Sequence, residues 1–357
     1  MNHRHVALID NQAIAANTVS IFNLKGMDPI SELMLQFRGA NNAAIPLDHP
    51  AGFFTRVQVV DGSEVIVDLT GKQCAALGYY HYHAMPQSLN VYVNTLWAGA
   101  TLRIPFGRWL WDQELALDPS RFKNLQVIVT LAIAGGGCGV ATGTFELVAN
   151  MFDQKKINPR GYLRAREHFV YTVVNGGIQT VDMPTDKVIK MVMFQGNQNL
   201  IALLQTISRI KLSEDNDKRI FVDNNVSDIL MNMGPDLPNI VEPIYAAGVI
   251  GNLTVFSAPF FEPQGVLGGT DAVNNWGQVL DLGGGNIRLT CAAVGNVRAT
   301  VNGIAPHGCI GIELGDGWDI DDWYSPSGTK ELKARLTAGA AGAGGTNKVI
   351  VQQLSNY

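Results

Sequence analysis

The chain has 357 residues, 46% of them hydrophobic and 16% charged, with 38 glycines and a formal net charge of -5. This composition excludes a disordered or highly solvated chain and describes a globular, loop-rich protein long enough for two domains of roughly 150 residues with a remainder. It gives no support to polyanion binding, because no Lys lies between Lys218 and Lys330 and phosphate contacts need cations, so we expect no sequence-specific nucleic-acid partner.

Residues 1–28 are predicted to form an arm outside the core of the first domain, because Asn and Gly interrupt their apolar residues. The first five residues lead into alternating polar and apolar positions without a continuous apolar run, so no secretory signal is predicted. His3 and His5 could present two imidazoles on one side of an extended chain. In an arm we interpret both as solvent-exposed.

Strand signals are dense through the predicted first domain, residues 29–155. Val57–Val60 and Val65–Leu69 are apolar runs separated by Asp61-Gly62, a pair that favours a two-residue hairpin turn because both turn positions take positive φ. A short helical turn is predicted at Gly71–Leu77, and further strands are predicted at Leu89–Leu96, Leu125–Ile133 and Phe145–Ala149.

His81 and His83 lie in a predicted strand, where alternate residues share a face, and could supply two imidazoles to a metal ion. No third ligand follows at a suitable spacing. Tyr79, Tyr80 and Tyr82 around them favour the rim of a sandwich or an interface. We therefore assign no metal to this pair.

Asp112 and Glu114 lie beside Trp109 and Trp111 and could form the carboxylate pair of a glycosidase, although the tryptophans equally suit a core or an interface. The segment Gly135-Gly136-Gly137-Cys138-Gly139 lacks the Lys-Ser/Thr of a phosphate-binding loop, so we predict a flexible hairpin connection there. No Ser-His-Asp or Cys-His arrangement can be argued, so no catalytic residue or cofactor is assigned and no enzymatic activity is expected.

Residues 124–145 carry no charge and nearly reach the length of a helix that crosses a bilayer. Their apolar residues alternate with Gln126 and Thr130, however, and the run breaks at three consecutive glycines. This pattern predicts two soluble strands joined by a glycine turn.

Two echoes in the sequence indicate a duplicated unit. Val59–Gly62 recurs as Val173–Gly176 at an offset of 114 residues, and Pro119–Leu125 recurs as Pro326–Leu332 at an offset of 207, with Pro, Ser, Lys and Leu at matching positions. Because the echoes keep their order and the offsets differ by 93 residues (207 minus 114), the second copy must carry a large insertion.

The second domain is predicted at residues 156–357, with its boundary inside the polar, turn-rich segment Asp153–Gly161 and an insertion at about 218–318. Helical turns are predicted at Asn197–Gln205 and Asp223–Met231. Strands of the second domain are predicted at Lys187–Phe194, Leu332–Ala338 and Val349–Leu354, and strands of the insertion at Ile287–Cys291, Val297–Val301 and Cys309–Leu314.

Two other groups of residues could carry chemistry. The acidic run Glu313, Asp316, Asp319, Asp321 and Asp322 could gather around Ca²⁺, but it lacks the spacing of a calcium loop, and carboxylates beside glycines favour a solvated turn. The four cysteines show no C-x-x-C spacing and too low a density for a disulfide framework, so we predict reduced, buried thiols. They are Cys74, Cys138, Cys291 and Cys309.

Each unit thus offers about eight short strands with hairpin turns and crossing loops, which is typical of an antiparallel sandwich such as a jelly roll. The expected fold class is all-β, with two tandem eight-stranded jelly-roll sandwiches, the second carrying a large β-rich loop insertion. On this plan the whole chain resembles the double jelly-roll major capsid proteins of tailless icosahedral viruses, the lineage of tectiviruses, corticoviruses and adenoviruses. The resemblance rests on the tandem pair, the insertion, the turns at Asp61-Gly62 and Asn175-Gly176, and the stretch Arg103–Trp111 leading to Asp118–Ser120 and Leu125–Val129.

The resemblance implies a homotrimer in which six similar units form a pseudo-hexagonal block that tiles an icosahedral shell. It implies that the insertion is an outward tower and that the arm and inner loops face a genome or an internal membrane. The implied partners are further copies of the chain, penton proteins and minor capsid proteins. The implied location is the virion of a virus such as a bacteriophage, after synthesis in the host cytoplasm.

An alternative is a tandem β-sandwich that binds or acts on carbohydrate, with the insertion and Trp276, Trp318, Trp323 and Tyr324 shaping a cleft. The missing secretion signal and the lack of a persuasive carboxylate pair oppose this alternative. A viral spike or minor shell protein built from the same modules is a third, less favoured, interpretation.

Overall fold

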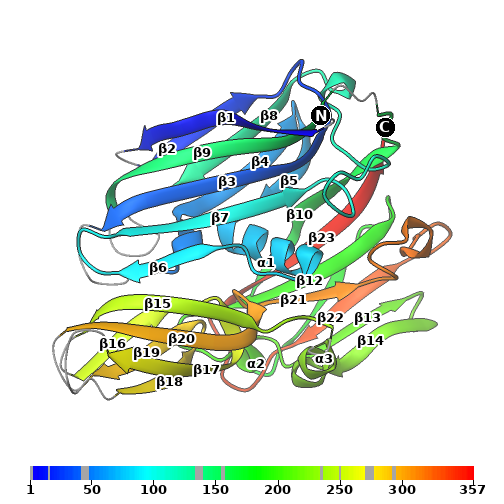
Figure 1. Ribbon diagram of the computed structural model, residues 1–357. Coiled ribbons are helices and arrows are strands. Elements are labelled where there is room, and N and C mark those ends of the chain that lie inside the picture. The colour runs from blue at the N-terminus through cyan, green and yellow to red at the C-terminus, as the bar shows by residue number, and fades with distance from the viewer. Residues whose placement is uncertain are drawn as a thin grey trace.

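The computed structural model describes residues 3–14, 17–41, 48–132, 140–153, 157–233, 236–248, 251–269, 277–291 and 295–357. Two jelly rolls and a smaller β subdomain lie around a central helix, as Figure 1 shows. The first roll runs from blue through cyan to green, the second from green to red, and the subdomain is yellow to orange.

Two four-stranded sheets form the first roll. One has the order β1-β9-β3-β7 and the other β2-β8-β4-β5, so that, apart from the β4–β5 hairpin, successive strands of the roll lie in opposite sheets, as in a jelly roll. The strands of the first sheet are β1 (His3–Ile14), β9 (Val140–Phe152), β3 (Ile30–Asn41) and β7 (Trp97–Pro105). Those of the second are β2 (Thr18–Asn23), β8 (Leu125–Leu131), β4 (Phe54–Asp61) and β5 (Glu64–Leu69).

The second roll repeats this order strand for strand, with the sheets β10-β23-β12-β21 and β11-β22-β13-β14. The expected fold class is therefore confirmed. The strands of its first sheet are β10 (Gly161–Thr172), β23 (Thr346–Asn356), β12 (Ile189–Asn197) and β21 (Cys309–Glu313). Those of its second sheet are β11 (Ile178–Asp182), β22 (Leu332–Thr337), β13 (Arg209–Glu214) and β14 (Arg219–Asn225).

Short helices and one extra strand connect these elements. In the first roll they are η1 (Pro50–Phe53), α1 (Gly71–Tyr82), β6 (Ser88–Tyr92) and η2 (Pro119–Arg121). In the second roll they are α2 (Leu203–Thr206), α3 (Val226–Met233) and η4 (Ile320–Asp322). The helix α1 begins with a capping box in which the side chains of Thr70 and Gln73 satisfy each other's backbone N–H groups.

The inserted subdomain, which we call the tower, lies between α3 and β21 and has two sheets around its own apolar core. Its strands are β15 (Ile240–Gly248), β16 (Gly251–Phe256), β17 (Pro259–Gly269), β18 (Gly277–Gly283), β19 (Asn286–Cys291) and β20 (Gly295–Pro306). One sheet, β15-β20-β17, continues the first roll's sheet through the parallel pair β6 and β15. The tower is thus attached by backbone hydrogen bonds to the roll that did not supply its sequence.

The two rolls also share a sheet. Strand β5 of the first roll pairs in parallel with β10 of the second, with Ala165 opposite Val67 and Arg166 opposite Asp68. The result is one eight-stranded sheet, β2-β8-β4-β5-β10-β23-β12-β21, that runs through both rolls.

Alternation of side chains explains both cores. In β8, Leu125, Val127, Val129 and Leu131 are buried while the residues between them are only half-buried. Leu332, Ala334, Leu336 and Ala338 are buried in the same phase in and beside β22. Because the two strands hold the same position in their rolls, the echo at an offset of 207 is a structural repeat.

The echo at an offset of 114 is not a structural repeat, because Asn175-Gly176 does not form the hairpin turn that the matching Asp61-Gly62 forms. Asp61-Gly62 joins β4 and β5, which pair with each other as predicted. Asn175-Gly176 joins β10 and β11, which belong to different sheets and pair with β23 and β22. The turn sequence is shared because both sites need positive φ at Gly, which is +60° at Gly62 and at Gly176.

Two boundaries also need correction. Residues 1–28 are not an arm outside the core, because β1 pairs with β9 and β2 pairs with β8. The insertion predicted at 218–318 is too long at both ends. β14 pairs with β13 in the second roll, and β21 pairs with β12, so the tower occupies only the segment between Met233 and Cys309.

Candidate assembly interface

The contact between the two rolls combines strand pairing with a cluster of charged side chains. The guanidinium of Arg56 binds the carboxylate of Asp68 through two hydrogen bonds, and its Nη1 lies 3.6 Å from Glu167 of β10. Glu167 also accepts a hydrogen bond of 2.6 Å from Lys348 and one of 2.7 Å from Gln73. The edge of the first roll is therefore covered by complementary charges of the second roll.

The helix α1 ties the first roll to the rest of the molecule. The hydroxyl of Tyr80 donates to the backbone oxygen of Cys309 at 2.8 Å, and the Tyr80 ring lies so close to Gly311 that a side chain there would overlap it. The hydroxyl of Tyr79 donates to the backbone oxygen of Pro238 at 2.7 Å, and burial raises its pKa to about 12. Two adjacent tyrosines thus reach the second roll and the start of the tower.

Each roll carries an ion pair between corresponding strands, and the charges are reversed. In the first roll Glu32 of β3, fully buried, accepts hydrogen bonds of 2.6 and 2.9 Å from Arg103 of β7, which is 30% exposed. In the second roll Lys190 of β12, 3% exposed, lies 3.4 Å from Glu313 of β21, which is 34% exposed. Burial lowers the pKa of Lys190, although Glu313 opposes that shift.

A second buried polar cluster fixes the base of the tower. The carboxylate of Glu242 in β15 accepts hydrogen bonds from His49 Nε2 at 2.8 Å, Ser88 Oγ at 2.9 Å and the Ala258 N–H at 2.6 Å. Burial alone would raise the pKa of Glu242, but His49 together with hydrogen bonds from Ala258 and Asn90 outweighs that effect, and the pKa is lowered. The ring of His307 packs 4.6 Å from that of His49, and burial holds its pKa well below the ordinary value.

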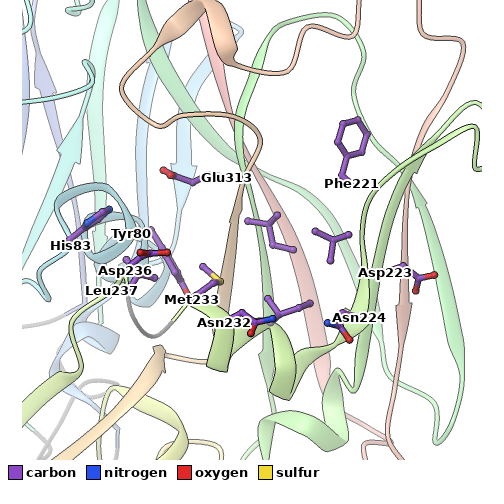
Figure 2. A pocket seen from close by; sticks show the side chains of 13 residues that line it. Tyr80, His83, Phe221, Asp223, Asn224, Asn232, Met233, Asp236, Leu237 and Glu313 are labelled. Carbon is purple, nitrogen blue, oxygen red and sulfur yellow. The ribbon is translucent and has the colours of Figure 1, made fainter.

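The open side of the second roll forms a groove. A cavity of about 530 Å³ lies between α1, β14, α3 and β21 and has a mostly apolar lining with acidic side chains. Figure 2 shows Tyr80 and His83 on one side of this cavity, Asp223 and Asn224 on the other, and Asn232 and Met233 on α3. A second cavity of about 320 Å³ adjoins it and shares Phe221, Val222, Ile312 and Glu313 in its lining. We call the two cavities together the β14–β21 groove.

Sequence reasoning missed this groove because it assigned β14 to the insertion. A similar spacing of Arg and Asp in the two rolls could have placed β14 in the second roll. Arg56 and Asp68 lie 12 residues apart and Arg209 and Asp223 lie 14 apart, and each pair forms an ion pair across corresponding strands.

The predicted histidine pairs do not form metal sites. His81 belongs to α1, not to a strand, and its imidazole is buried, whereas His83 is the residue that caps the end of the helix with a positive φ of 51°. His3 stacks on Trp111 with ring centroids 4.3 Å apart, and His5 hydrogen bonds to Asn150, so both belong to strand β1 of the first roll. Across the described ranges, no three His, Cys, Asp or Glu side chains are placed to hold a metal ion.

The acidic run is a series of turns. Asp316, Asp319 and Asp322 each accept a hydrogen bond from a nearby backbone N–H, at 2.9, 3.0 and 2.7 Å. The carboxylates therefore stabilise the local backbone. Glu313, which begins the acidic run, forms an ion pair with Lys190 instead.

Asp112 and Glu114 lie close together because both carboxylates bind the guanidinium of Arg108. Arg108 donates to Asp112 Oδ2 at 2.8 Å and to Glu114 Oε2 at 2.6 Å, and Arg160 lies 3.1 Å from Glu114. Two arginines neutralise the pair, which is the opposite of the environment that keeps a catalytic carboxylic acid protonated.

Of the aromatic residues of the proposed sugar cleft, Trp323 and Tyr324 both line the smaller cavity of the β14–β21 groove, and Trp318 lies outside that lining. Trp318 is half exposed and lies 6.1 Å from Trp109, whereas Trp323 and Tyr324 are buried and donate hydrogen bonds to Asp316 and Glu214. Trp276 lies outside the described residues, as does the segment Gly135–Gly139.

Two of the four cysteines can be described. Cys74 and Cys309 are free and buried, and burial raises the pKa of both thiols. Cys138 and the side chain of Cys291 lie outside the described residues. In the part of the chain that is described, no helix has the length and hydropathy needed to cross a membrane.

Comparison with known proteins gives a fold and no sequence family. No family model matches the chain, and no curated protein matches it. Among solved structures, the STIV MCP superimposes with a TM-score of 0.63 at 7% identity, covering 100% of this chain and 97% of that one. The major capsid protein P2 from bacteriophage PM2 has a TM-score of 0.57 at 9% identity, covering 99% and 98%.

The PBCV-1 virus capsid model has a TM-score of 0.53 at 10% identity, covering 99% of this chain and 93% of that one. At such identities the matches establish the fold, which is a double jelly roll over the full length of the chain. The matches do not favour a carbohydrate-binding sandwich.

Proposed function

We propose that the chain is a viral major capsid protein that assembles as a homotrimer into an icosahedral shell. The observation that carries this proposal is the full-length match to major capsid proteins, which covers both rolls and the tower and leaves little of either chain unmatched. A chance likeness between single sandwiches would cover only half of each chain.

The physical argument for a trimer is the duplication itself. Two similar rolls in each chain give a trimer six similar lateral units, so contacts around a hexagonal lattice can be nearly uniform with one gene product. The rolls are held together in one sheet, and each presents strands at its outer edges.

We further propose two domains that meet at residues 155 and 156. The strands up to Phe152 belong to the first roll, and those from Gly161 belong to the second roll with its tower. In this division the first domain also includes β1 and β2.

The same proposal gives the chain a mechanical role in the virion without catalysis. Its partners would be neighbouring capsomers, penton proteins and minor capsid proteins, with an internal membrane or genome on the inner side. Synthesis would take place in the host cytoplasm.

Light scattering after size-exclusion chromatography tests this function. We expect a stable species of about 116 kDa, three times 38.6 kDa, because obligate interfaces commonly bury upwards of ~2,000 Å². Negative-stain electron microscopy of that species should show a pseudo-hexagonal outline. A chain that stays monomeric at micromolar concentration and forms no particles contradicts the proposal.

A further inference from the structure

The two rolls differ in how their corresponding edges are covered. In the first roll β5 pairs with β10, and β7 pairs with β6. In the second roll the corresponding strands are β14 and β21, and within the described residues β14 pairs only with β13 and β21 only with β12. Both of these edges border the β14–β21 groove. An edge strand with free backbone groups is a template for pairing with another chain.

The correspondence of the two edges can be fixed residue by residue. Arg56 lies opposite Thr130 and Arg209 lies opposite Thr337, and these threonines are related by the offset of 207. In the same way Asp68 corresponds to Asp223, because each lies across from the middle of its partner strand. The Arg56–Asp68 and Arg209–Asp223 ion pairs are therefore equivalent.

These equivalent ion pairs show what is missing from the second roll. Asp68 lies opposite Arg166 of β10, and its side chain is only 17% exposed. Asp223 lies opposite Lys211 of β13 on one side and has no strand on the other side within the described chain, and its side chain is 31% exposed. The second roll thus has the same edge as the first, without the strand that covers it.

The chain also contains a strand suited to that position. β10, which covers β5, is the first strand of its roll. The first strand of the other roll is β1, which pairs with β9 on one side and has no partner on the other among the described strands. Val6, Leu8 and Ile9 pack against the core of the first roll, and Arg4 forms an ion pair with Asp28, so what β1 offers to another chain is the backbone of its free edge.

The groove leaves room for a strand beside β14. Phe221, Val222 and Ile312 give its wall an apolar surface, and Ile229, Met233 and Leu237 continue it. Two of its acidic side chains already have partners, because Asp223 pairs with Arg209 and Glu313 with Lys190. The fit of β1 to this groove therefore rests on strand pairing along two free edges and not on charge.

We propose that the β14–β21 groove receives the β1 edge of a second copy of the chain, and that β14 pairs with that β1 in parallel as β5 pairs with β10. This inference rests on the proposed self-assembly and adds which two edges meet. The β1 edge of one chain meets the β14 edge of another, so the two contacting surfaces differ and the contact is head-to-tail. Each chain carries one β1 edge and one β14 edge. Repetition of such a contact produces a closed ring when the rotation allows closure.

A mixing experiment with two variants of the full chain tests the proposal. Val222→Glu places a carboxylate on β14 in the groove, and Ala7→Glu places one on the exposed side of β1. Both add negative charge to the proposed contact, where a charge without a partner is unfavourable. Val266→Glu makes the same change on an exposed residue of the tower and is the matched control.

We expect each groove or β1 variant to elute alone as a monomer of 38.6 kDa, while the control behaves like the wild type. An equimolar mixture of the two variants should form a heterodimer of about 77 kDa, twice 38.6 kDa. The Val222→Glu chain still has an intact β1, and the Ala7→Glu chain still has an intact groove, so one contact between them remains possible. If the wild type assembles and both variants assemble equally well, the proposed contact is wrong but the proposed function stands. If the wild type does not self-associate, the function itself fails.

Hydrogen exchange on the wild-type protein gives a second test that needs no variant. On dilution of the oligomer to monomers, amide protection should fall at least tenfold in β14 and in β1. It should stay unchanged in β11, the opposite edge of the β14 sheet. Equal protection of β14 at both concentrations would overturn the proposal.

Discussion

The two rolls share a strand order, but they close their open sides differently. In the first roll α1 has 12 residues, almost all buried, and fills the space beside β7, while β10 covers β5. In the second roll α3 has only 8 residues, and a groove remains beside β14 and β21. The comparison teaches that duplicated units keep their pairing inside the sandwich and diverge at their edges, where each copy has a different neighbour.

The cores of the two rolls differ as well. The first roll has an aromatic cluster in which Phe37 lies 4.5 Å from Phe53 and 6.5 Å from Phe54, measured between ring centroids. The interior of the second roll is built mainly from aliphatic side chains around Phe194. The first roll should therefore be the more sensitive to loss of a single ring.

The largest effect is expected from Phe37→Ala. Removal of this fully buried ring from an aromatic cluster should lower the free energy of unfolding by ~3–5 kcal/mol, because the cavity cannot collapse completely. Urea unfolding followed by tryptophan fluorescence measures the change. Phe169→Ala, at a half-exposed phenylalanine of β10, should cost less than about 1 kcal/mol. Equal losses would contradict the contrast between core and surface.

The reversed ion pairs sharpen the comparison. Arg103→Met leaves the carboxylate of Glu32 buried without its cation, and Glu313→Gln does the same to the ammonium of Lys190, so each should cost about 3 kcal/mol. The reciprocal change Lys190→Met leaves a carboxylate that reaches solvent and should cost less than about 1 kcal/mol.

The measurement is again the free energy of unfolding in urea. The contradictory result would be a larger loss from Lys190→Met than from Glu313→Gln. That outcome would mean that packing of the lysine chain matters more than its charge.

A smaller effect is expected from pH at the tower base. His307 has a lowered pKa in the folded protein, so the unfolded chain binds more protons below the ordinary histidine value of about 6.5, and stability is lost as the pH falls below it. His81, at the junction of the rolls, acts in the same direction. Glu242, with a lowered pKa, adds a loss at still lower pH.

Melting temperatures between pH 7.5 and pH 5 test this prediction. Each histidine can contribute a slope of up to about 1.4 kcal/mol per pH unit, and His307→Asn should reduce the slope by one such contribution. Val266→Gln, at an exposed residue of the tower that does not titrate, is the control and should leave the slope unchanged. A slope that is the same in all three proteins would show that buried histidines do not control acid stability.

The sequence predicted the strands whose side chains alternate. A strand with one buried face has apolar residues at every second position, and this alternation identifies Leu125–Leu131 and Leu332–Thr337 in the sequence. The fold class followed from the number and spacing of such runs. It also followed from the echo that links these two strands.

The sequence could not show which strands pair across the two rolls. His81 was assigned to a strand because Tyr and His alternate around it, whereas the capping box at Thr70 and Gln73 starts a helix that continues to Tyr82. β1 lacks a strict alternation because it is an edge strand with two irregularities in its pairing to β9, so it was interpreted as an arm. Whether the edge of a sheet is covered depends on a strand that is distant in sequence, as β10 is from β5.

The shared sheet has a consequence for any shell built from this chain. Because backbone hydrogen bonds between β5 and β10 join the rolls, bending the chain at that junction would break strand pairing. The two halves must therefore act as one stiff tile. Curvature of a closed surface has to come from the joints between tiles.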